Sequence, residues 1–345
     1  RGIASGDGAA IADDRLQFGE RFEAGEAGVF VGVEDDRVAL ALGNGHRRYF
    51  GSETSAGLSG GGALLLMLNI LENFELGRMA AGSAESLHLL AETMRLGHRD
   101  RVRFFGDTDF AKVPLEGMTS KAYAAQRAKL INKRKAAKND AVKAGDPFAF
   151  ESPSTTHYSV ADRYGNVVSV TYTLGSDFGS GTMIDGTGIL LNNQMNNFSH
   201  ERAWSAARSG EPAPPNAMQP GKRMISTMMP TLVFRDDKPW LALGTPGGGR
   251  IINTVLQVLV NIVDFRLNVD EATHQARISQ GDGALEVEPN FNPDTLELLR
   301  RKGHRIKASE TMGSAQSIAI ENGFFLGAAD PRRPGAAAVA PAEVK

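Results

Sequence analysis

Cysteine is absent from this chain of 345 residues. Its absence excludes disulfides, thiol nucleophiles and thiolate metal sites together, and it leaves the redox compartment undetermined. An excess of charge is also lacking: the formal net charge is −2, which gives no electrostatic case for binding nucleic acid or an anionic membrane. The longest apolar run, Ala63 to Ile70, contains Asn69 and is far too short to span a bilayer.

Metal-ligand spacing is missing as well. The seven histidines show no pattern such as His-Glu-x-x-His, so the sequence predicts neither a metal site nor a cofactor. No signal-peptide pattern opens the chain. Because the first residue is Arg1 and not Met, we expect a processed or trimmed start.

What is present is an ordinary globular composition, 41% hydrophobic and 23% charged, with enough chain for a substantial core. The pair Gly165-Asn166 lies between two strand-like alternations and predicts a hairpin turn. Helices come first, then strands, a helix and more strands, which favours a layered α+β fold over a regular βαβ repeat. The predicted helices cover 63–74, 84–96, 251–265 and 293–302, and the predicted strands 29–33, 37–42, 156–163, 167–173, 188–192, 231–236, 239–243, 304–309 and 316–320.

Two polar stretches interrupt this order. Residues 119–143 are basic and weakly amphipathic, and they predict a helix with a solvated face. Their neighbours cancel the charge, so we predict no nucleic-acid partner. Residues 199–223 contain four prolines and predict a long loop, of the kind that serves as a lid or binding loop or is disordered.

The chemistry of the chain depends on how Thr155 is interpreted. A Pro/Ser-rich break ends at Ser154, and a strand-like alternation then begins with Thr155 and Thr156. A threonine at the head of a strand is usually only a β-branched strand former. If the preceding peptide bond is cut, however, its hydroxyl becomes a nucleophile and its own α-amine becomes the base. His157 fits a structural role, because the chain has no Gly-x-Ser-x-Gly elbow.

Three further stretches are candidates for binding. Residues 192–197 carry five amides within six residues, which suits a zwitterionic or amide substrate or, equally, an amide-rich turn. Gly247 and Gly248 precede a helix and offer backbone N–H groups to an anion or oxyanion, without the spacing of a phosphate loop. Ser226 and Thr227 have hydroxyls for a carboxylate, and the alternative is a turn or cap.

Several of these stretches together closely resemble the γ-glutamyltranspeptidase family. The likeness covers roughly residues 50 to 335. Its motifs are Leu68–Phe74 and Gly106–Phe110, similar to the end of the family's large subunit, and 155–160, 162–166, 170–174, 188–195, 244–250 and 312–317, similar to its small subunit.

The resemblance implies an N-terminal-nucleophile hydrolase with an αββα four-layer sandwich. It also implies self-cleavage of a precursor between Ser154 and Thr155. Residues 1–154 would be the C-terminal part of the large subunit and residues 155–345 the small subunit, together forming one globular unit.

The same resemblance implies roles for single residues. Thr155 would attack the γ-carbonyl of a glutathione-type γ-glutamyl amide, and its α-amine, with an unperturbed pKa of about 8, would act as the base. Thr173 would orient the nucleophile, and the amides of Gly247 and Gly248 would form the oxyanion hole. Water or an amine acceptor would then resolve the γ-acyl-enzyme.

For the substrate, the resemblance assigns the α-carboxylate to Ser226 and Thr227 and the α-amino end to Gln194 and Asn197. The family usually has an aspartate where Asn197 stands. A charge-assisted contact is worth roughly 1.5–3 kcal/mol against about 1 kcal/mol for a neutral one, so asparagine favours acyl groups without the amine.

Two other departures matter. Gly175 stands where the family often has a substrate-contacting asparagine, and the family's carboxylate-binding arginine belongs to a region that precedes this chain. The alternatives to a γ-glutamyl enzyme are therefore a glutaryl-type cephalosporin acylase and an unprocessed homologue without activity. The compartment is not fixed by the sequence, and the resemblance to bacterial members suggests the periplasm or secretion.

Overall fold

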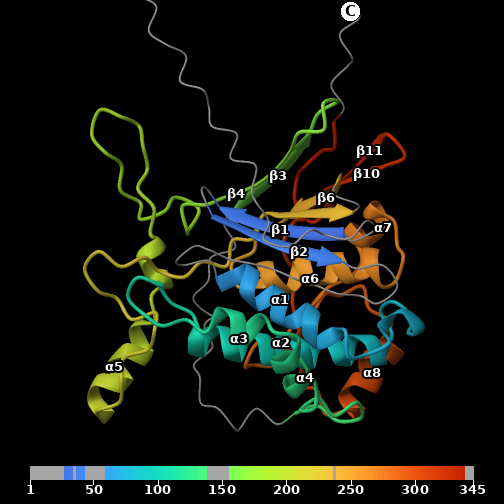
Figure 1. Ribbon diagram of the computed structural model, residues 1–345, viewed down its shortest axis with the longest axis horizontal. Helices are drawn as coiled ribbons and strands as arrows, with labels where there is room; N and C mark the ends of the chain where they lie inside the picture. Colours follow the sequence, from blue (N-terminus) through green and yellow to red (C-terminus); the bar gives the residue numbers. More distant parts are fainter. Residues whose placement is uncertain (1–26, 34–35, 43–58, 138–154, 236–237, 339–345) are drawn as a thin grey trace, which may run out of the picture.

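The computed structural model describes residues 27–33, 36–42, 59–137, 155–235 and 238–338 (Figure 1). Their centre is a six-stranded sheet in the order β11-β10-β6-β5-β1-β2, in which all neighbours are antiparallel. The strands are β1 Ala27–Val33, β2 Asp36–Leu42, β5 Thr231–Arg235, β6 Lys238–Gly244, β10 Gln316–Glu321 and β11 Phe324–Ala329.

Helices cover one face of this sheet. Figure 1 shows α1 (Ser59–Leu71) and α6 (Arg250–Val263) next to the strands, with further helices beneath them. Every residue of α1 is buried, because helices pack around it on several sides. The outer helices are α2 Ala84–Phe104, α3 Leu115–Thr119, α4 Lys121–Ala128 and α8 Pro293–Arg301.

The other face of the sheet carries the hairpin of β3 (Thr156–Ala161) and β4 (Val167–Tyr172), which contacts β5, β6 and β10. Asp162 closes its turn, since one carboxylate oxygen accepts the N–H groups of Tyr164 and Asn166 at 2.8 and 3.0 Å. Gly165 has a φ of +90°, which suits glycine. The predicted hairpin is confirmed.

Short elements complete the description. A small sheet joins β7 (Ile278–Ser279) antiparallel to β8 (Leu285–Val287) and β8 parallel to β9 (Ile306–Ala308). The remaining elements are η1 Leu76–Arg78, η4 Gln194–Asn197, α5 His200–Ser209 and α7 Val269–His274. Helices on one face of an antiparallel sheet and a hairpin on the other agree with the predicted α+β class.

Several predicted elements differ from the structure. Residues 188–192 are not a strand, because Leu190 makes only an isolated bridge to Met183. The predicted helix over 119–143 ends at Ala128, and shortly after it the side chain of Asn132 accepts two backbone N–H groups in a turn. Its last part, from residue 138, lies outside the described residues.

Two further boundaries were wrong. The helix predicted to end at Leu96 continues to Phe104, since its last turns bury polar side chains such as His98 and Asp100 that an apolar pattern does not reveal. The loop predicted over 199–223 contains α5. In the described part of the chain, no helix has both the length and the apolar character needed to cross a membrane.

Candidate functional site

The hairpin brings Thr155 and Thr173 together. Thr155 directly precedes β3 and Thr173 directly follows β4, and the register pairs their neighbours Thr156 and Tyr172. The Oγ1 of Thr155 donates to the Oγ1 of Thr173 at 3.1 Å. The same Thr173 oxygen accepts the N–H of Gly175 at 2.9 Å, so the Thr155 hydroxyl is held by an oxygen that the backbone itself fixes.

The predicted oxyanion residues lie in the glycine loop, residues 245–249, between β6 and α6. Gly247 and Gly248 have φ values of +138° and +56°, which side chains rarely adopt. The Oγ1 of Thr245 donates to the carbonyl oxygen of Pro246 at 2.7 Å and accepts the N–H of Ser314 at 2.8 Å. Backbone N–H groups at the start of the 14-residue α6 lie beside its positive end, which suits an oxyanion.

His157 packs the hairpin onto the strand that leads to the glycine loop. A Cβ at Gly244 would lie 2.3 Å from the Cε1 of His157, so only glycine admits the imidazole there. The Nδ1 of His157 lies 2.9 Å from the Oγ1 of Thr171. Burial lowers the pKa of His157 to about 4, so the ring is neutral at pH 7 and serves as a packing group.

This buried imidazole predicts acid sensitivity. Between about pH 6.5 and about pH 4 the unfolded chain binds a proton at His157 and the folded chain does not, so the free energy of unfolding falls as the pH falls through that window. Urea unfolding at pH 7, 6 and 5 measures the slope. His157→Gln should reduce the slope, and an equal slope in the parent protein and the variant would contradict the assignment.

The amide segment is anchored beside Thr173. The N–H of Asn193 donates to the carbonyl oxygen of Leu174 at 2.9 Å, and its side chain binds Ser176 through two hydrogen bonds of 2.7 and 2.9 Å. In the following η4, the Nδ2 of Asn197 donates to the Oε1 of Gln194 at 2.7 Å. The two residues predicted to bind the substrate's α-amino end are therefore in direct contact.

Gly175 is explained by this anchor. Its φ is +95°, and a Cβ there would lie 1.9 Å from the Oδ1 of Asn193. Gly175→Ala should lower the free energy of unfolding by about 2–3 kcal/mol, because backbone strain adds to displacement of Asn193. Gly188→Ala is the matched control, with φ +72° and open space around it, and should cost only about 1 kcal/mol. Urea unfolding compares the two, and equal losses would remove Asn193 from the explanation.

Ser226 and Thr227 lie against the N-terminus of α1. The Oγ of Ser59 donates to the carbonyl oxygen of Ser226 at 2.9 Å and accepts from the Nε of the buried Arg101 at 2.7 Å. A Cβ at Gly60 would lie 3.1 Å from the carbonyl oxygen of Thr227, so the two backbones approach closely. The Ser226 hydroxyl accepts the backbone N–H of Met228, as expected for the turn role that was the alternative to carboxylate binding. The same hydroxyl can still donate a hydrogen bond.

Asn216 connects the two predicted substrate-binding segments. Its Nδ2 donates to the carbonyl oxygen of Asn197 at 2.7 Å, and its Oδ1 accepts the N–H of Ile225, next to Ser226, at 3.1 Å. It is 2% exposed, so both bonds are shielded from water. Asn216 was not among the predicted site residues, because a polar residue among prolines carries no periodic signal.

A buried ionic network fixes the loop 312–315 that abuts the glycine loop. Arg277 bonds Asp330 at 2.6 Å and the carbonyl oxygen of Met312 at 2.7 Å. Arg332 bridges Glu288 and Asp330 at 2.5 and 3.1 Å. Burial alone would raise the pKa of Asp330, but the two guanidinium groups outweigh it and hold the pKa below its usual range. This network was also absent from the sequence-based predictions.

Arg333 is a further residue that the sequence did not reveal. Its Nη1 donates to the carbonyl oxygen of Thr155 at 3.3 Å, which brings a positive charge to the backbone of the predicted nucleophile. It stands in a Pro-Arg-Arg-Pro stretch near the end of the described chain. Ser154 lies outside the described residues, so scission before Thr155 stays a prediction.

Most of the chain is similar in sequence to known proteins. The chain is 45% identical to the glutathione hydrolase proenzyme of Escherichia coli (strain K12) over 277 residues, covering 79% of this chain and 48% of that protein. It is 36% identical to the Acylase ACY 1 proenzyme of Pseudomonas sp. (strain SE83) over 281 residues, covering 80% and 48%. The chain thus spans about half the length of the curated relatives that it matches.

Among solved structures, the cephalosporin acylase from Bacillus halodurans superposes with a TM-score of 0.69 at 27% identity, covering 88% of this chain and 51% of that one. This similarity confirms the predicted α+β fold of the N-terminal-nucleophile hydrolase type. The sequence profile described as Gamma-glutamyltranspeptidase matches residues 53–340. The chain therefore belongs to the γ-glutamyltranspeptidase family.

Proposed function

We propose that this chain carries the nucleophile of a self-processing N-terminal-threonine amidohydrolase and transferase that cleaves γ-glutamyl amides such as glutathione. The observation that carries the proposal is the hydrogen bond between the Oγ1 atoms of Thr155 and Thr173 at 3.1 Å, at the head of a hairpin. The E. coli relative at 45% identity, a glutathione hydrolase proenzyme, supports the substrate class.

The proposed mechanism begins with scission of the peptide bond between Ser154 and Thr155. The freed α-amine of Thr155 accepts the hydroxyl proton as Oγ1 attacks the γ-carbonyl carbon. The N–H groups of Gly247 and Gly248 stabilise the developing oxyanion. The amine leaving group takes the proton as the amide bond breaks, and a γ-acyl ester remains on Thr155. Water or an acceptor amine then attacks this ester through the same base and oxyanion donors.

Substrate recognition would use the two segments that Asn216 ties together. The hydroxyls of Ser226 and Thr227 would bind the α-carboxylate, beside the start of α1. Gln194 and Asn197 would bind the α-amino end by hydrogen bonds. Because Asn197 is neutral, this end of the site lacks an ion pair with a substrate ammonium.

That neutrality favours a second candidate, a glutaryl-type acylase, whose acyl group has no amine. One relative is an acylase, the Acylase ACY 1 proenzyme, and one similar structure is a cephalosporin acylase, which supports an acylase activity. A third candidate is a homologue that folds but is never processed. A denaturing gel distinguishes it, since a protein that stays uncut at Thr155 has no N-terminal threonine there.

Asn197→Asp tests the choice between acyl groups. We expect the carboxylate to raise selectivity for a γ-glutamyl over a glutaryl anilide by about tenfold, because a charge-assisted bond is roughly 1–2 kcal/mol stronger than a neutral one. The ratio of kcat/KM values for the two anilides is the measurement. Replacing the adjacent exposed Asn196 by aspartate controls for added charge, and the same ratio in both variants would contradict ammonium pairing.

The partners of the site would be the two products of one precursor, residues 1–154 as large-subunit sequence and 155–345 as the small subunit. The outward face of the hairpin is apolar and exposed: Tyr158 is 51% accessible, Val160 52%, Val168 48% and Tyr172 61%. We propose that polypeptide equivalent to the half of the relatives that this chain does not span covers this face. We assign no nucleic-acid or membrane partner, since the net charge is −2.

A further inference from the structure

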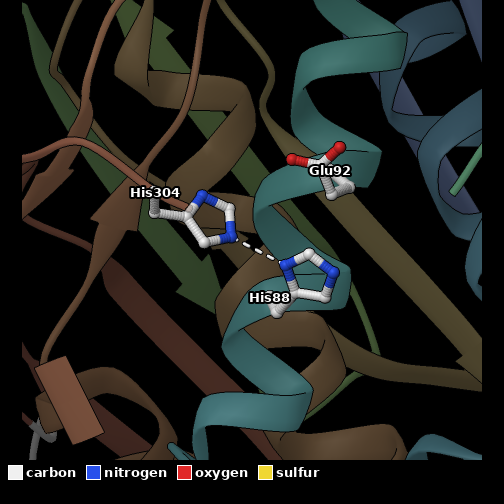
Figure 2. A group of neighbouring side chains, drawn as sticks. All are labelled: His88, Glu92 and His304. Carbon is white, nitrogen blue, oxygen red and sulfur yellow. Dashed lines mark hydrogen bonds between the residues drawn. The ribbon is translucent and has the colours of Figure 1, made fainter. Parts of the chain in front are cut away.

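Three potential metal ligands meet far from the hairpin, between the outer helices. His88 and Glu92 lie one turn apart on α2, and His304 lies 216 residues after His88, between α8 and β9 (Figure 2). One ligand atom from each residue lies within 4.8 Å of the others. All three side chains are buried, at 0%, 3% and 4% exposure.

The hydrogen bonds determine where the imidazole protons are. The Nε2 of His88 lies 2.8 Å from the carbonyl oxygen of Asn132, which can only accept, so this nitrogen carries a proton. The Nδ1 of His88 is then an acceptor for the Nε2–H of His304, at 2.7 Å. His304 is left with an unprotonated Nδ1.

Two acceptors in the cluster therefore receive no hydrogen bond. Among the described residues, the Nδ1 of His304 and the Oε1 of Glu92 are buried without a hydrogen-bond donor, although Oε1 faces the Arg95 guanidinium at 3.1 Å as an ion pair. Buried acceptors normally have a donor or a cation, because burial without one costs free energy. Glu92 Oε1 has the Arg95 cation, whereas the Nδ1 of His304 has no hydrogen-bond donor in the described structure, so the cluster keeps a buried lone pair and ligand capacity that its hydrogen bonds do not use.

We propose that His88, Glu92 and His304 bind one divalent transition-metal ion of the zinc class. The Nδ1 of His88, the Nε2 of His304 and one oxygen of Glu92 supply three ligands, and a water molecule supplies the fourth. The proton on the Nε2 of His304 moves to its Nδ1, so the ring stays neutral. The bond from His88 to the Asn132 carbonyl is the outer contact that typically orients a metal-bound histidine.

Metal binding requires a local rearrangement of the three side chains. Zinc–nitrogen bonds of about 2.0–2.1 Å in a tetrahedral site place donor atoms about 3.3 Å apart. The two histidine nitrogens must therefore separate from 2.7 Å, and the carboxylate of Glu92 must turn one oxygen toward the ion, away from its present contacts with the N–H of Ala137 at 3.0 Å and with Arg95. Burial holds the pKa of His304 at about 3 and lowers that of His88, so protons do not compete for the lone pairs at neutral pH.

Nearby positive charges weaken the binding of a metal cation at this site. Arg95 pairs with Glu92 at 3.1 Å, and Lys302 lies close enough to act on both histidines. Arg95 competes with the metal for the carboxylate, so removal of its charge should tighten binding. If the cluster has only a structural role, Arg95→Gln breaks a buried ion pair, which destabilises the fold and does not tighten zinc binding.

The site would cross-link α2, the connection after α8 and the segment at Asn132. None of its ligands contacts Thr155, Thr173 or the glycine loop in the described structure, so the metal has a structural role and stands apart from the proposed hydrolysis. Binding to the folded state alone raises the midpoint of unfolding with metal concentration. The site is thus testable whether or not the protein hydrolyses γ-glutamyl amides.

The test uses purified protein that has been treated with a chelator and then dialysed against Zn²⁺ or Co²⁺. We expect one zinc ion per chain by elemental analysis, intense visible absorption bands from tetrahedral Co²⁺, and a higher unfolding midpoint with zinc. His304→Gln and Glu92→Gln should each weaken binding at least tenfold, and Arg95→Gln should strengthen it. His98→Gln is the matched control, a buried histidine on the same helix that should leave metal binding intact.

Failure of the parent protein to bind zinc in a one-to-one ratio would overturn the proposal. A cobalt spectrum typical of octahedral coordination would also overturn it. Zinc binding that survives the loss of both His88 and His304 would do the same, because that binding would belong to exposed histidines. Circular dichroism of each variant establishes folding. If the ligand variants do not fold, the parent's cobalt spectrum and the direction of the Arg95→Gln effect still decide the question.

Discussion

Replacement of Thr155 by alanine should abolish both scission of the chain and turnover of γ-glutamyl amides, with a loss in kcat of at least about a thousandfold. The reason is that in the proposed mechanism one atom, Oγ1, acts as the nucleophile in both reactions and no neighbouring group replaces it. Thr173 accepts its hydrogen bond at 3.1 Å but follows β4 within the chain, so it has no free α-amine of its own. Scission is read on a denaturing gel, and turnover with a γ-glutamyl anilide.

Two matched variants make this result specific. Thr155→Ser keeps a hydroxyl and should retain both reactions at a reduced rate. Thr156→Ala removes the adjacent threonine, which is exposed in β3, and should leave scission in place. If instead Thr156→Ala stops scission while Thr155→Ala permits it, the nucleophile is the second threonine and the proposed register is wrong by one residue.

Arg277→Met should have the largest effect on stability, a loss of about 3–5 kcal/mol in the free energy of unfolding. Arg277 is 1% exposed and bonds Asp330, and its removal leaves a buried carboxylate with only Arg332 to balance it. The bond to the Met312 carbonyl is lost as well, which releases the loop beside the glycine loop. Turnover should therefore fall in the fraction that remains folded.

The control for Arg277 is an arginine whose ion pair is exposed. Arg301 lies 3.1 Å from Glu297, with side-chain accessibilities of 72% and 49%. Arg301→Met should change the free energy of unfolding by less than about 0.5 kcal/mol, because solvent screens exposed pairs. Urea unfolding of both variants gives the comparison, and a loss below about 1 kcal/mol for Arg277→Met would contradict the role assigned to the network.

The elements that the sequence predicted well have strong local signals. The hairpin follows from alternating residues around Gly165-Asn166, and α6 from an apolar run after the glycine loop. By contrast, 188–192 has strand-like residues but no neighbouring strand, so only one bridge forms. The second half of α2 was missed because its buried polar residues are satisfied by side chains elsewhere in the chain.

The site residues also fall into two groups, those that belong to local motifs and those that act through distant contacts. The roles of Thr155, Gly247 and Gly248 come from motifs that are contiguous in sequence, and contiguous motifs can be recognised from the order of residues alone. Asn216 and Arg277 act through contacts to residues 19 and 53 positions away, and Asn216 also contacts Ile225. Neither periodicity nor composition encodes such distant contacts, and only the folded chain brings those partners together.

Peptide mapping by mass spectrometry tests the central claim most directly. Purified protein is incubated with a γ-glutamyl donor, quenched in acid and digested. We predict a small fragment whose N-terminus is Thr155 and a γ-glutamyl ester on that residue, lost in Thr155→Ala. A chain that turns over substrate while remaining uncut before Thr155, or an acyl group found on another residue, would contradict the assignment of Thr155 as the nucleophile.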